Sequence, residues 1–457
     1  MTLSRQNADT TANAFWQKLL ALVAGLFLAL CLLKFGNPVI FEEKISPPRD
    51  YIEFLVSAWP IPWGYFALGL LLLASFPVAN WKKQTAPRWI LFSVLLWLVW
   101  QFVAATQTVD AKLTSATVRH FCTCAICFFI GYFALSEVAN KKLMWAGLLV
   151  GYLLMLRAGF EQHFGGLEAT RRYFELYVAP KLTTPPPPDL LKKISSTRIF
   201  GTLFYPNSLA GAILLGWPIL TAFLVSVIRR PALRWCVVVV LSFVSVAALI
   251  WSGSKAGWLL ALAIAGVGLL QMPVARRTKI YVVGAIFVLG LTAFGLKYAG
   301  FFKKGATSVV ARTDYWRAAV QISQQSPLVG TGPGTFMVPY AKLKAPEAEM
   351  ARLVHNDYLQ QASDSGWPGF LAYAVFIWGG LLFLYQKRIR SQLGKSLDSG
   401  SFALWLGLVA LALHSFVEFH LYIAGLAWAF FLLFGMLCGA PANGIDKPPS
   451  TGKVARQ

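Results

Sequence analysis

The chain has 457 residues, of which 57% are hydrophobic and only 13% are charged, and its formal net charge is +22. Soluble domains carry about a quarter charged residues, so this composition excludes an ordinary soluble enzyme. The basic residues are spread over short segments between apolar blocks, which argues against a nucleic-acid partner and favours contact with anionic membrane lipids.

The apolar residues come in blocks of roughly 15 to 20, the length of a helix that crosses a bilayer. They lack the period-two alternation that an outer-membrane barrel requires. We therefore predict an all-α polytopic membrane protein with about twelve transmembrane helices. The predicted spans are 15–33, 61–79, 89–105, 121–136, 143–159, 208–227, 235–252, 256–271, 280–297, 367–385, 402–417 and 421–438.

Every second short loop is rich in Lys and Arg, beginning with Lys82, Lys83 and Arg88. Basic loops stay in the cytoplasm, so an even number of spans places both termini there. Two long loops, at about 160–207 and about 298–366, then fall on the periplasmic side. Loops of this length are usually functional or disordered.

This pattern divides the chain into four parts. Residues 1–297 hold helices 1–9 and the first long loop, and 298–366 form a partly helical second loop. Residues 367–440 hold helices 10–12, and 441–457 form a polar tail that we expect to be disordered and cytoplasmic.

Three cysteines, Cys122, Cys124 and Cys127, lie inside one predicted span. Thiols in such a place behave as small apolar residues, so neither a disulfide framework nor a redox pair is expected.

The first long loop contains the polyproline stretch TTPPPPDLL, which we interpret as a stiff spacer. Further along, Arg198 precedes Pro206-Asn207-Ser208, which caps the next span. Arg198 either snorkels at the membrane interface or joins a polar site where the two long loops converge.

A second isolated cation, Lys255, stands in the turn SGSKAG on the same side of the membrane. It is either a simple interfacial anchor or a cation that faces a functional cavity.

The second long loop contains SVVARTDYWRAAVQIS, which has helical periodicity. At 100° per residue, Val309, Arg312 and Trp316 share one face and Arg317 lies on the opposite one. A cation on the buried face needs a partner, so Arg312 is a candidate binding residue and Arg317 is solvated surface.

Next come the glycine-rich PLVGTGPGTF and the stretch AKLKAPEAEMARL, for which we predict a turn and a short charged helix. The turn could offer backbone amides to a phosphate, although a purely structural turn is favoured. The acidic pair Glu347 and Glu349 lies among basic residues, which favours a solvated face over a metal site.

The stretch HNDYLQQASDSGWPG predicts a helix that begins at Asn356 or Asp357 and ends near Gly366, with Asn356 as an N-cap. His355 then lies just outside the helix N-terminus. A neutral imidazole there can act as a general base near pH 7, and a hydrogen-bonded structural histidine is the alternative.

One more polar group, LHSFVEFHLY, ends a later span. His414 and Glu418 are four residues apart and can share a helix face. The spacing of His414, Glu418 and His420 matches no metal-site motif, so a metal is not expected.

Taken together, these residues resemble the O-antigen ligase and O-antigen polymerase superfamily of bacterial membrane glycan transferases. The motifs that carry the resemblance are RTDYWRAA, PLVGTGPGTF, HNDYLQ and SGWPGF, in this order within about 60 residues. RIFGTLFYPNSLAG and SGSKAGWL are weaker pieces, and the layout of spans agrees over the whole chain.

The resemblance implies an enzyme that moves a glycan from undecaprenyl diphosphate to an acceptor hydroxyl, without metal or cofactor, at the periplasmic face of the bacterial inner membrane. It implies that Arg198 and Arg312 bind the diphosphate and that His355 activates the hydroxyl or holds the leaving group. The family usually has Arg where this chain has Lys255, and Lys keeps the charge but loses the planar fork of donors. Asn207, Trp316, Asn356, Asp357 and Glu418 are expected to support these groups.

The expected reaction is a single displacement with inversion, because a base must face the side of the sugar opposite the leaving group. Lipid A–core is the first candidate acceptor. An O-antigen or exopolysaccharide polymerase, with a second lipid-linked glycan as acceptor, is the alternative. A glycolipid transporter is disfavoured because the charges lie at the ends of spans and not near mid-membrane.

Overall fold

The computed structural model describes residues 2–178, 191, 194–271, 275–303, 307–346, 348–390 and 400–440. Within these ranges the chain is almost entirely helical and contains no β-strand, which confirms the predicted all-α class. The polyproline stretch at 185–188 and the predicted tail at 441–457 lie outside the described residues.

The α-helices, and the short 3-10 and π segments labelled η, have the following bounds. The first part of the chain forms α1 (Thr2–Lys34), η1 (Val39–Lys44), α2 (Tyr51–Val56), α3 (Ile61–Ser75), α4 (Arg88–Ala105), α5 (Ala111–Phe133), η2 (Leu135–Glu137), α6 (Lys142–Glu161), η3 (Gln162–Gly166), α7 (Leu167–Tyr173) and η4 (Phe174–Val178). The second part forms α9 (Pro206–Val227), α10 (Pro231–Ser252), α11 (Lys255–Leu270), α12 (Arg276–Lys303), α13 (Thr307–Gln325), α14 (Met337–Leu343), α15 (Asp357–Ala374), η6 (Val375–Gly379), α16 (Gly380–Leu384), η7 (Tyr385–Ile389), α17 (Gly400–His414), η9 (His420–Tyr422) and α18 (Ala424–Gly439).

Among the described residues, eight helices are long and apolar enough to cross a membrane. They are Ala12–Lys34, Arg88–Ala105, Ala111–Glu137, Lys142–Leu176, Pro206–Val227, Pro231–Ser252, Arg276–Phe301 and Asp357–Lys387. Four shorter apolar helices, α3, α11, α17 and α18, coincide with the remaining predicted spans. The chain is therefore a polytopic helical membrane protein, and the total of twelve spans stays a prediction.

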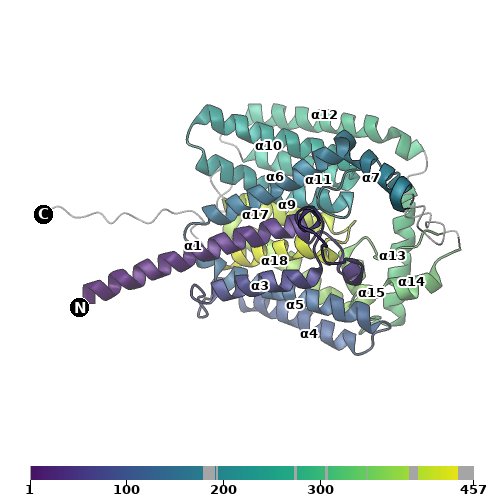
Figure 1. Cartoon of the computed structure of the whole chain (residues 1–457), viewed down its shortest axis with the longest axis horizontal. Helices are drawn as coiled ribbons and strands as arrows, with labels where there is room; N and C mark the ends of the chain where they lie inside the picture. Colours follow the sequence, from purple (N-terminus) through teal and green to yellow (C-terminus); the bar gives the residue numbers. More distant parts are fainter. Residues whose placement is uncertain are drawn as a thin grey trace.

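The centre of the bundle is α18, in which every residue from Ala424 to Gly439 is buried. Figure 1 shows α18 enclosed by other helices, and it contacts α1, α5, α9 and α17. It packs most closely on α5 because glycines on both helices let the backbones approach. A Cβ atom at Gly131 would collide with the Leu432 carbonyl, and one at Gly435 with the Phe128 carbonyl.

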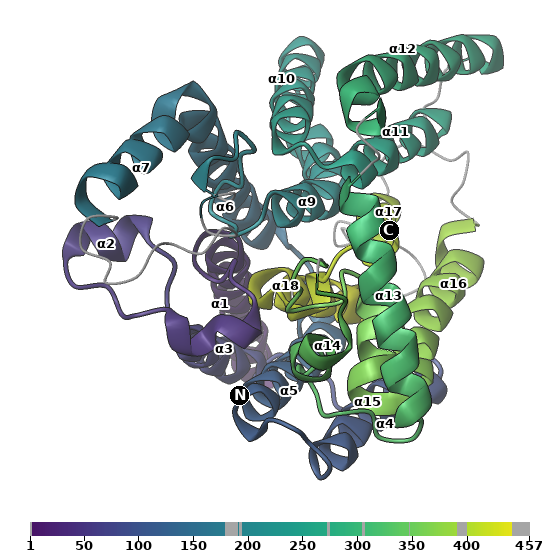
Figure 2. The ribbon, with the colours of Figure 1, turned by 90° about the vertical axis from the view of Figure 1, so that its right-hand side faces the viewer.

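A second group of helices, α9 to α12, lies beside this core (Figures 1 and 2). α9 packs against α17 and α10, and α11 packs against α9, α12 and α17. α12 is the outermost of the four, since none of the residues in its apolar window is buried.

α13 crosses one end of the bundle, as Figures 1 and 2 both show. It forms over the stretch in which the sequence predicts a helix. The helix predicted within 341–353 is wrong, because α14 ends at Leu343. Pro346 explains this, since a proline restricts the residue before it to extended backbone.

α15 begins at Asp357 with Asn356 as its N-cap, and its first helical stretch ends at a kink at Gly366, both as predicted. The backbone turns at Gly366, with φ 70° and ψ 179°, and then resumes as helix with Pro368 in the next turn. A Cβ atom at Gly366 would collide with the Leu328 carbonyl, so only glycine fits this contact with the segment after α13.

Two more predictions concern the first long loop and the cysteines. Helical structure continues past residue 160: α6 is followed by η3, which bends at Gly165 (φ 121°), and then by α7. Cys122, Cys124 and Cys127 are free thiols on α5, and the last two are buried.

Candidate functional site

One buried carboxylate, Glu418, contacts polar side chains from three distant segments. It lies between α17 and η9 and is 3% exposed. Arg312 of α13 and Asn207 of α9 both donate to its Oε1 atom. Its Oε2 atom lies 3.3 Å from Nδ1 of His355. The structure thus brings together Arg312, Asn207, His355 and Glu418, although the sequence treats them as separate candidates.

Arg198 joins this cluster through Asn207. Its Nη2 donates to the Asn207 side-chain oxygen at 2.7 Å, and its Nε donates to the Ser252 carbonyl at 2.7 Å. Asn207 therefore connects Arg198 to Glu418, with its oxygen facing one and its amide nitrogen facing the other. These bonds fix Arg198 inside the protein, which excludes the simple snorkelling alternative.

The two arginines of α13 differ in exposure as the helical periodicity predicts. The side chain of Arg312 is 20% exposed and pairs with Glu418. The side chain of Arg317 is 82% exposed and lies 3.8 Å from Asp314. The buried face of the helix thus carries the cation that needs a partner, and that partner is Glu418.

Two donors on the same face of α13 are unused. Neither Nε of Arg312 nor the indole N–H of Trp316, one turn later, has a hydrogen-bond partner among the residues that the structure describes. Buried donors without partners are rare in proteins. Both nitrogen atoms are buried, so this face of α13 carries two N–H groups that no described residue pairs with.

Lys255 approaches the cluster from α11, of which it is the first residue. Its ammonium lies 3.8 Å from the Phe301 ring centroid and 5.0 Å from that of Tyr298, both on α12. Arg198 and Arg312 are close enough to repel it electrostatically. Lys255 therefore lies near two other cations, of which Arg312 pairs with Glu418 and Arg198 reaches it through Asn207.

His355 is held in an unusual conformation. It has φ 55°, and is the only non-glycine residue with positive φ in the described part of the chain. Such a backbone costs of the order of 1–3 kcal/mol and persists only where the surroundings impose it. The rings of Phe419 and Tyr315, with centroids 4.7 and 5.9 Å away, hold the imidazole against Glu418.

Asn356 and Asp357 support the site through the backbone. The Asn356 side chain accepts from the amides of Tyr358 and Leu359, so it caps α15. Asp357 accepts from the amide of Leu421 at 2.9 Å, and its own amide donates to the Ser415 carbonyl at 2.9 Å. Asp357 thereby holds both ends of the turn that presents Glu418.

The prediction that His414 and Glu418 share a helix face is wrong, because α17 ends at His414 and the chain turns before Glu418. His414 instead lies 2.8 Å from His420, nitrogen to nitrogen. Both rings are buried, and burial together with His414 lowers the pKa of His420 well below its usual range. Among the described residues no group of three or more His, Cys, Asp or Glu side chains could hold a metal ion.

The glycine-rich turn after α13 is structural, as favoured from the sequence. The amide of Gly334 donates to the Asp364 side chain at 2.8 Å, and that of Gly332 to the Asp364 carbonyl at 2.9 Å. These amides are therefore not free to bind a phosphate. Of the acidic pair, Glu347 lies outside the described residues and Glu349 accepts from Tyr340 through its carbonyl.

Electrostatics keeps the centre of the cluster charged. Burial alone would raise the pKa of the Glu418 carboxyl, but Arg312 and His355 hold that pKa well below its ordinary value. Burial lowers the pKa of the Arg198 guanidinium, and Glu418 opposes that shift. The arrangement can bind a multivalent anion, since its cations outnumber the carboxylate they share.

A comparison with protein-family models identifies a family. The family model described as O-antigen ligase matches residues 240–374, from α10 to α15, and so includes Lys255, Arg312 and His355. Arg198 and Glu418 lie outside this range and join the cluster only in the folded chain. None of the curated proteins compared matches the chain. The family match confirms the resemblance to the O-antigen ligase superfamily that the motifs indicate.

Proposed function

We propose that this membrane protein of the O-antigen ligase type transfers a glycan from undecaprenyl diphosphate to an acceptor hydroxyl. The observation that carries the proposal is the convergence of Arg198, Arg312 and His355 on Glu418. Two of these residues lie in the matched region and two do not. A cluster built from four segments at one end of a helix bundle fits a substrate with an anionic head and a lipid tail.

The cations would bind the diphosphate of the donor. Arg312 keeps one unpaired N–H group, at Nε, while another of its nitrogens pairs with Glu418. Lys255 and Arg198 add two more charges nearby. As the sugar leaves, negative charge grows on the diphosphate oxygen, and fixed cations in a partly dry site stabilise that charge.

His355 would serve as the base. When its Nδ1–H donates to Glu418, the Nε2 lone pair is free to take a proton, as in other carboxylate–histidine pairs. The acceptor oxygen then attacks the anomeric carbon while the bond from that carbon to the diphosphate oxygen breaks. The hydroxyl proton passes to Nε2, the bonding electrons leave with the diphosphate, and the anomeric centre inverts.

The donor also determines where the reaction takes place. The carrier tail stays in lipid and the sugars stay in water, so the site belongs at the periplasmic edge of the bacterial inner membrane. The pattern of basic loops supports this location, because basic loops favour the cytoplasm and both termini would then lie there too. α13 and the segment up to residue 366 would cover the site from the periplasm.

Lipid A–core is the acceptor that we propose. Loss of a ligase leaves bare core and polymer on the carrier, whereas loss of a polymerase leaves core that bears one repeat unit. Deletion of the gene and separation of lipopolysaccharide on a gel therefore distinguishes the two activities.

The purified protein tests the chemistry directly. In a bilayer with undecaprenyl diphosphate-linked glycan and lipid A–core, we expect a glycosidic product and free undecaprenyl diphosphate without added metal. Movement of the donor across the bilayer with no new glycosidic bond would contradict the proposal and indicate a transporter.

A further inference from the structure

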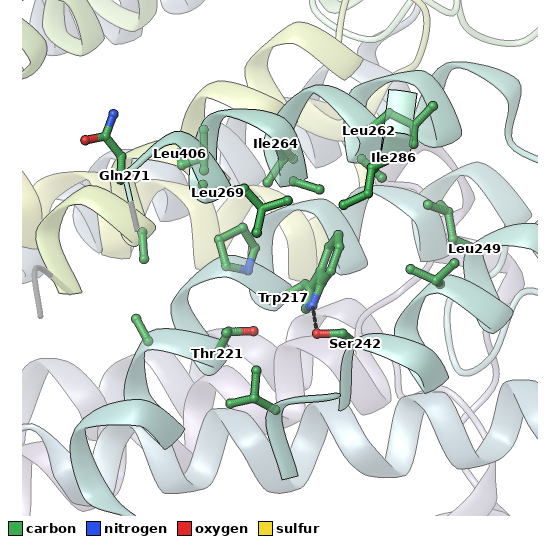
Figure 3. Close-up of a pocket in the computed structure, with 18 of the residues that line it drawn as sticks. Trp217, Thr221, Ser242, Leu249, Leu262, Ile264, Leu269, Gln271, Ile286 and Leu406 are labelled. Atoms are coloured by element: carbon green, nitrogen blue, oxygen red, sulfur yellow. Dashed lines mark hydrogen bonds between the residues drawn. The ribbon is translucent and has the colours of Figure 1, made fainter. Parts of the chain in front are cut away.

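A large apolar cavity lies among α9, α10, α11, α12 and α17, away from Glu418. Its volume is about 570 Å³. Figure 3 shows Leu249 toward one end and Gln271 at the other, with Leu262, Ile264 and Leu269 between them. One of its polar groups, the indole N–H of Trp217, donates to Ser242. The lining therefore offers hydrocarbon contact.

The cavity is long enough for an extended hydrocarbon chain. α11 lines it from Trp258 to Gln271. Thirteen residues of helix rise about 20 Å, which is about two thirds of the hydrocarbon core of a bilayer. A compact apolar ligand would need no such length, so the shape favours an extended hydrocarbon.

One end of the cavity adjoins the cationic cluster. Trp258 packs on Tyr298, and the ammonium of Lys255 lies over the same Tyr298 ring. Leu249 and Ile250 of the lining stand just before Ser252, whose carbonyl accepts from Arg198. A lipid in the cavity would therefore have its polar head beside Lys255 and Arg198.

We propose that this cavity holds the isoprenoid chain of the lipid diphosphate donor, an inference that rests on the proposed function. Lipid and protein interiors are equally apolar, so the chain gains little by leaving the bilayer. Its role is to align the head: dispersion contacts along the groove favour one lipid shape and fix where the diphosphate meets the cations.

Gly268 gives a way to fill the cavity without disturbing the fold. It lines the cavity, and a Cβ atom added there would meet no atom within 4 Å. Gly284 on α12 is equally open but does not line the cavity, so Gly284→Trp is the matched control for Gly268→Trp. Both changes replace glycine inside a helix, where Trp has the higher helix propensity.

The probe is a long-chain polyprenyl diphosphate with a photoreactive group at the far end of the chain. The full-length protein is labelled in phosphatidylethanolamine–phosphatidylglycerol bilayers, and the labelled peptides are identified by mass spectrometry. We expect labels on cavity-lining residues of α10 and α11, reduced about tenfold or more in Gly268→Trp and unchanged in Gly284→Trp.

Competition identifies the occupant. Unlabelled polyprenyl diphosphate should remove the label, and lipid A–core should not. The inference is overturned if excess polyprenyl diphosphate leaves the label in place, since bilayer lipid then fills the cavity. It is also overturned if lipid A–core displaces the label, or if Gly268→Trp is labelled like the unaltered protein.

A transfer assay separates this inference from the proposed function. Specific labelling of the cavity in a protein that forms no glycosidic bond would contradict the proposed function and leave the chain site standing. Glycan transfer by a protein whose cavity is not labelled would support the proposed function and contradict the chain site.

Discussion

Two buried carboxylates near α15, Asp364 and Glu418, have very different surroundings. Asp364 accepts from the amide of Gly334, the side chain of Gln360 and the hydroxyl of Tyr422, at 2.8, 2.9 and 3.0 Å. These donors are all neutral and belong to the protein. The hydrogen bonds of the Asp364 carboxylate are therefore all made within the protein. They connect the glycine-rich turn to α15 and to the segment before α18.

Glu418 is the centre of a polar cluster in which some hydrogen-bond donors remain unpaired. Its partners include a charged guanidinium and an imidazole whose side chains remain 20% and 29% exposed. Arg312 and Trp316 also keep N–H groups without partners in the described structure. A buried polar cluster whose hydrogen bonds are all made within the protein has a structural role. A cluster with surplus cations and unpaired donors is better explained by a ligand.

The largest effect should follow from removing the base. His355→Ala should lower the rate of glycan transfer by about 10²–10⁴-fold, the usual contribution of a positioned acid or base. The protein should still insert and fold, because alanine also carries a Cβ atom and the backbone strain at the positive φ stays the same. Transfer is measured with purified donor and acceptor in bilayers; an unchanged rate would make His355 purely structural.

Removal of the paired arginine should have a slightly smaller effect. Arg312→Ala should reduce transfer by about 10²–10³-fold, because it removes a donor to the leaving group. Arg317→Ala, on the exposed face of the same helix, is the matched control and should be near neutral. Equal losses at both positions would mean that the two faces of α13 do not differ in function.

Asp364 should contribute to the stability of the fold and not to the rate of glycan transfer. Asp364→Asn should destabilise the protein by about 1–3 kcal/mol, since it weakens three buried hydrogen bonds. The transfer rate per folded molecule should stay the same. Thermal unfolding and transfer assays on one preparation test this, and a rate lost without a stability change would place Asp364 in the reaction.

The charge of Glu418 should make the stability of the protein depend on pH. Its pKa is lower in the folded protein than in the unfolded chain, so its charge stabilises the fold above the ordinary pKa of about 4.3. Glu418→Gln should therefore be less stable than the unaltered protein at pH 7. The gap should shrink as the pH falls below about 4, where the unfolded carboxyl takes up protons. Unfolding midpoints at several pH values measure it; a gap independent of pH would show that the charge is not the stabilising feature.

The smallest effect is expected at Lys255. Lys255→Arg keeps the charge and restores a planar fork of donors, so transfer should change by no more than about threefold. Lys255→Gln removes the charge and should cost about tenfold. Identical rates for both variants would remove Lys255 from the donor site.

Local patterns predicted much of this molecule. Helical periodicity placed Arg312 inside and Arg317 outside, and capping chemistry placed the start of α15 at Asp357. The role of Glu418 was not predictable from spacing, because it depends on α17 ending at His414 and on a turn held by Asp357. The cavity left no sequence signal either, since residues that face lipid and residues that line an apolar cavity have the same character.

The most direct test of the account is the binding of polyprenyl diphosphate, without any sugar, to the purified protein in bilayers. Arg312→Ala should weaken this binding at least about tenfold, as expected for a charge-assisted contact, while Arg317→Ala should bind like the unaltered protein. Equal affinity in all three proteins would contradict the claim that the cations around Glu418 hold the diphosphate.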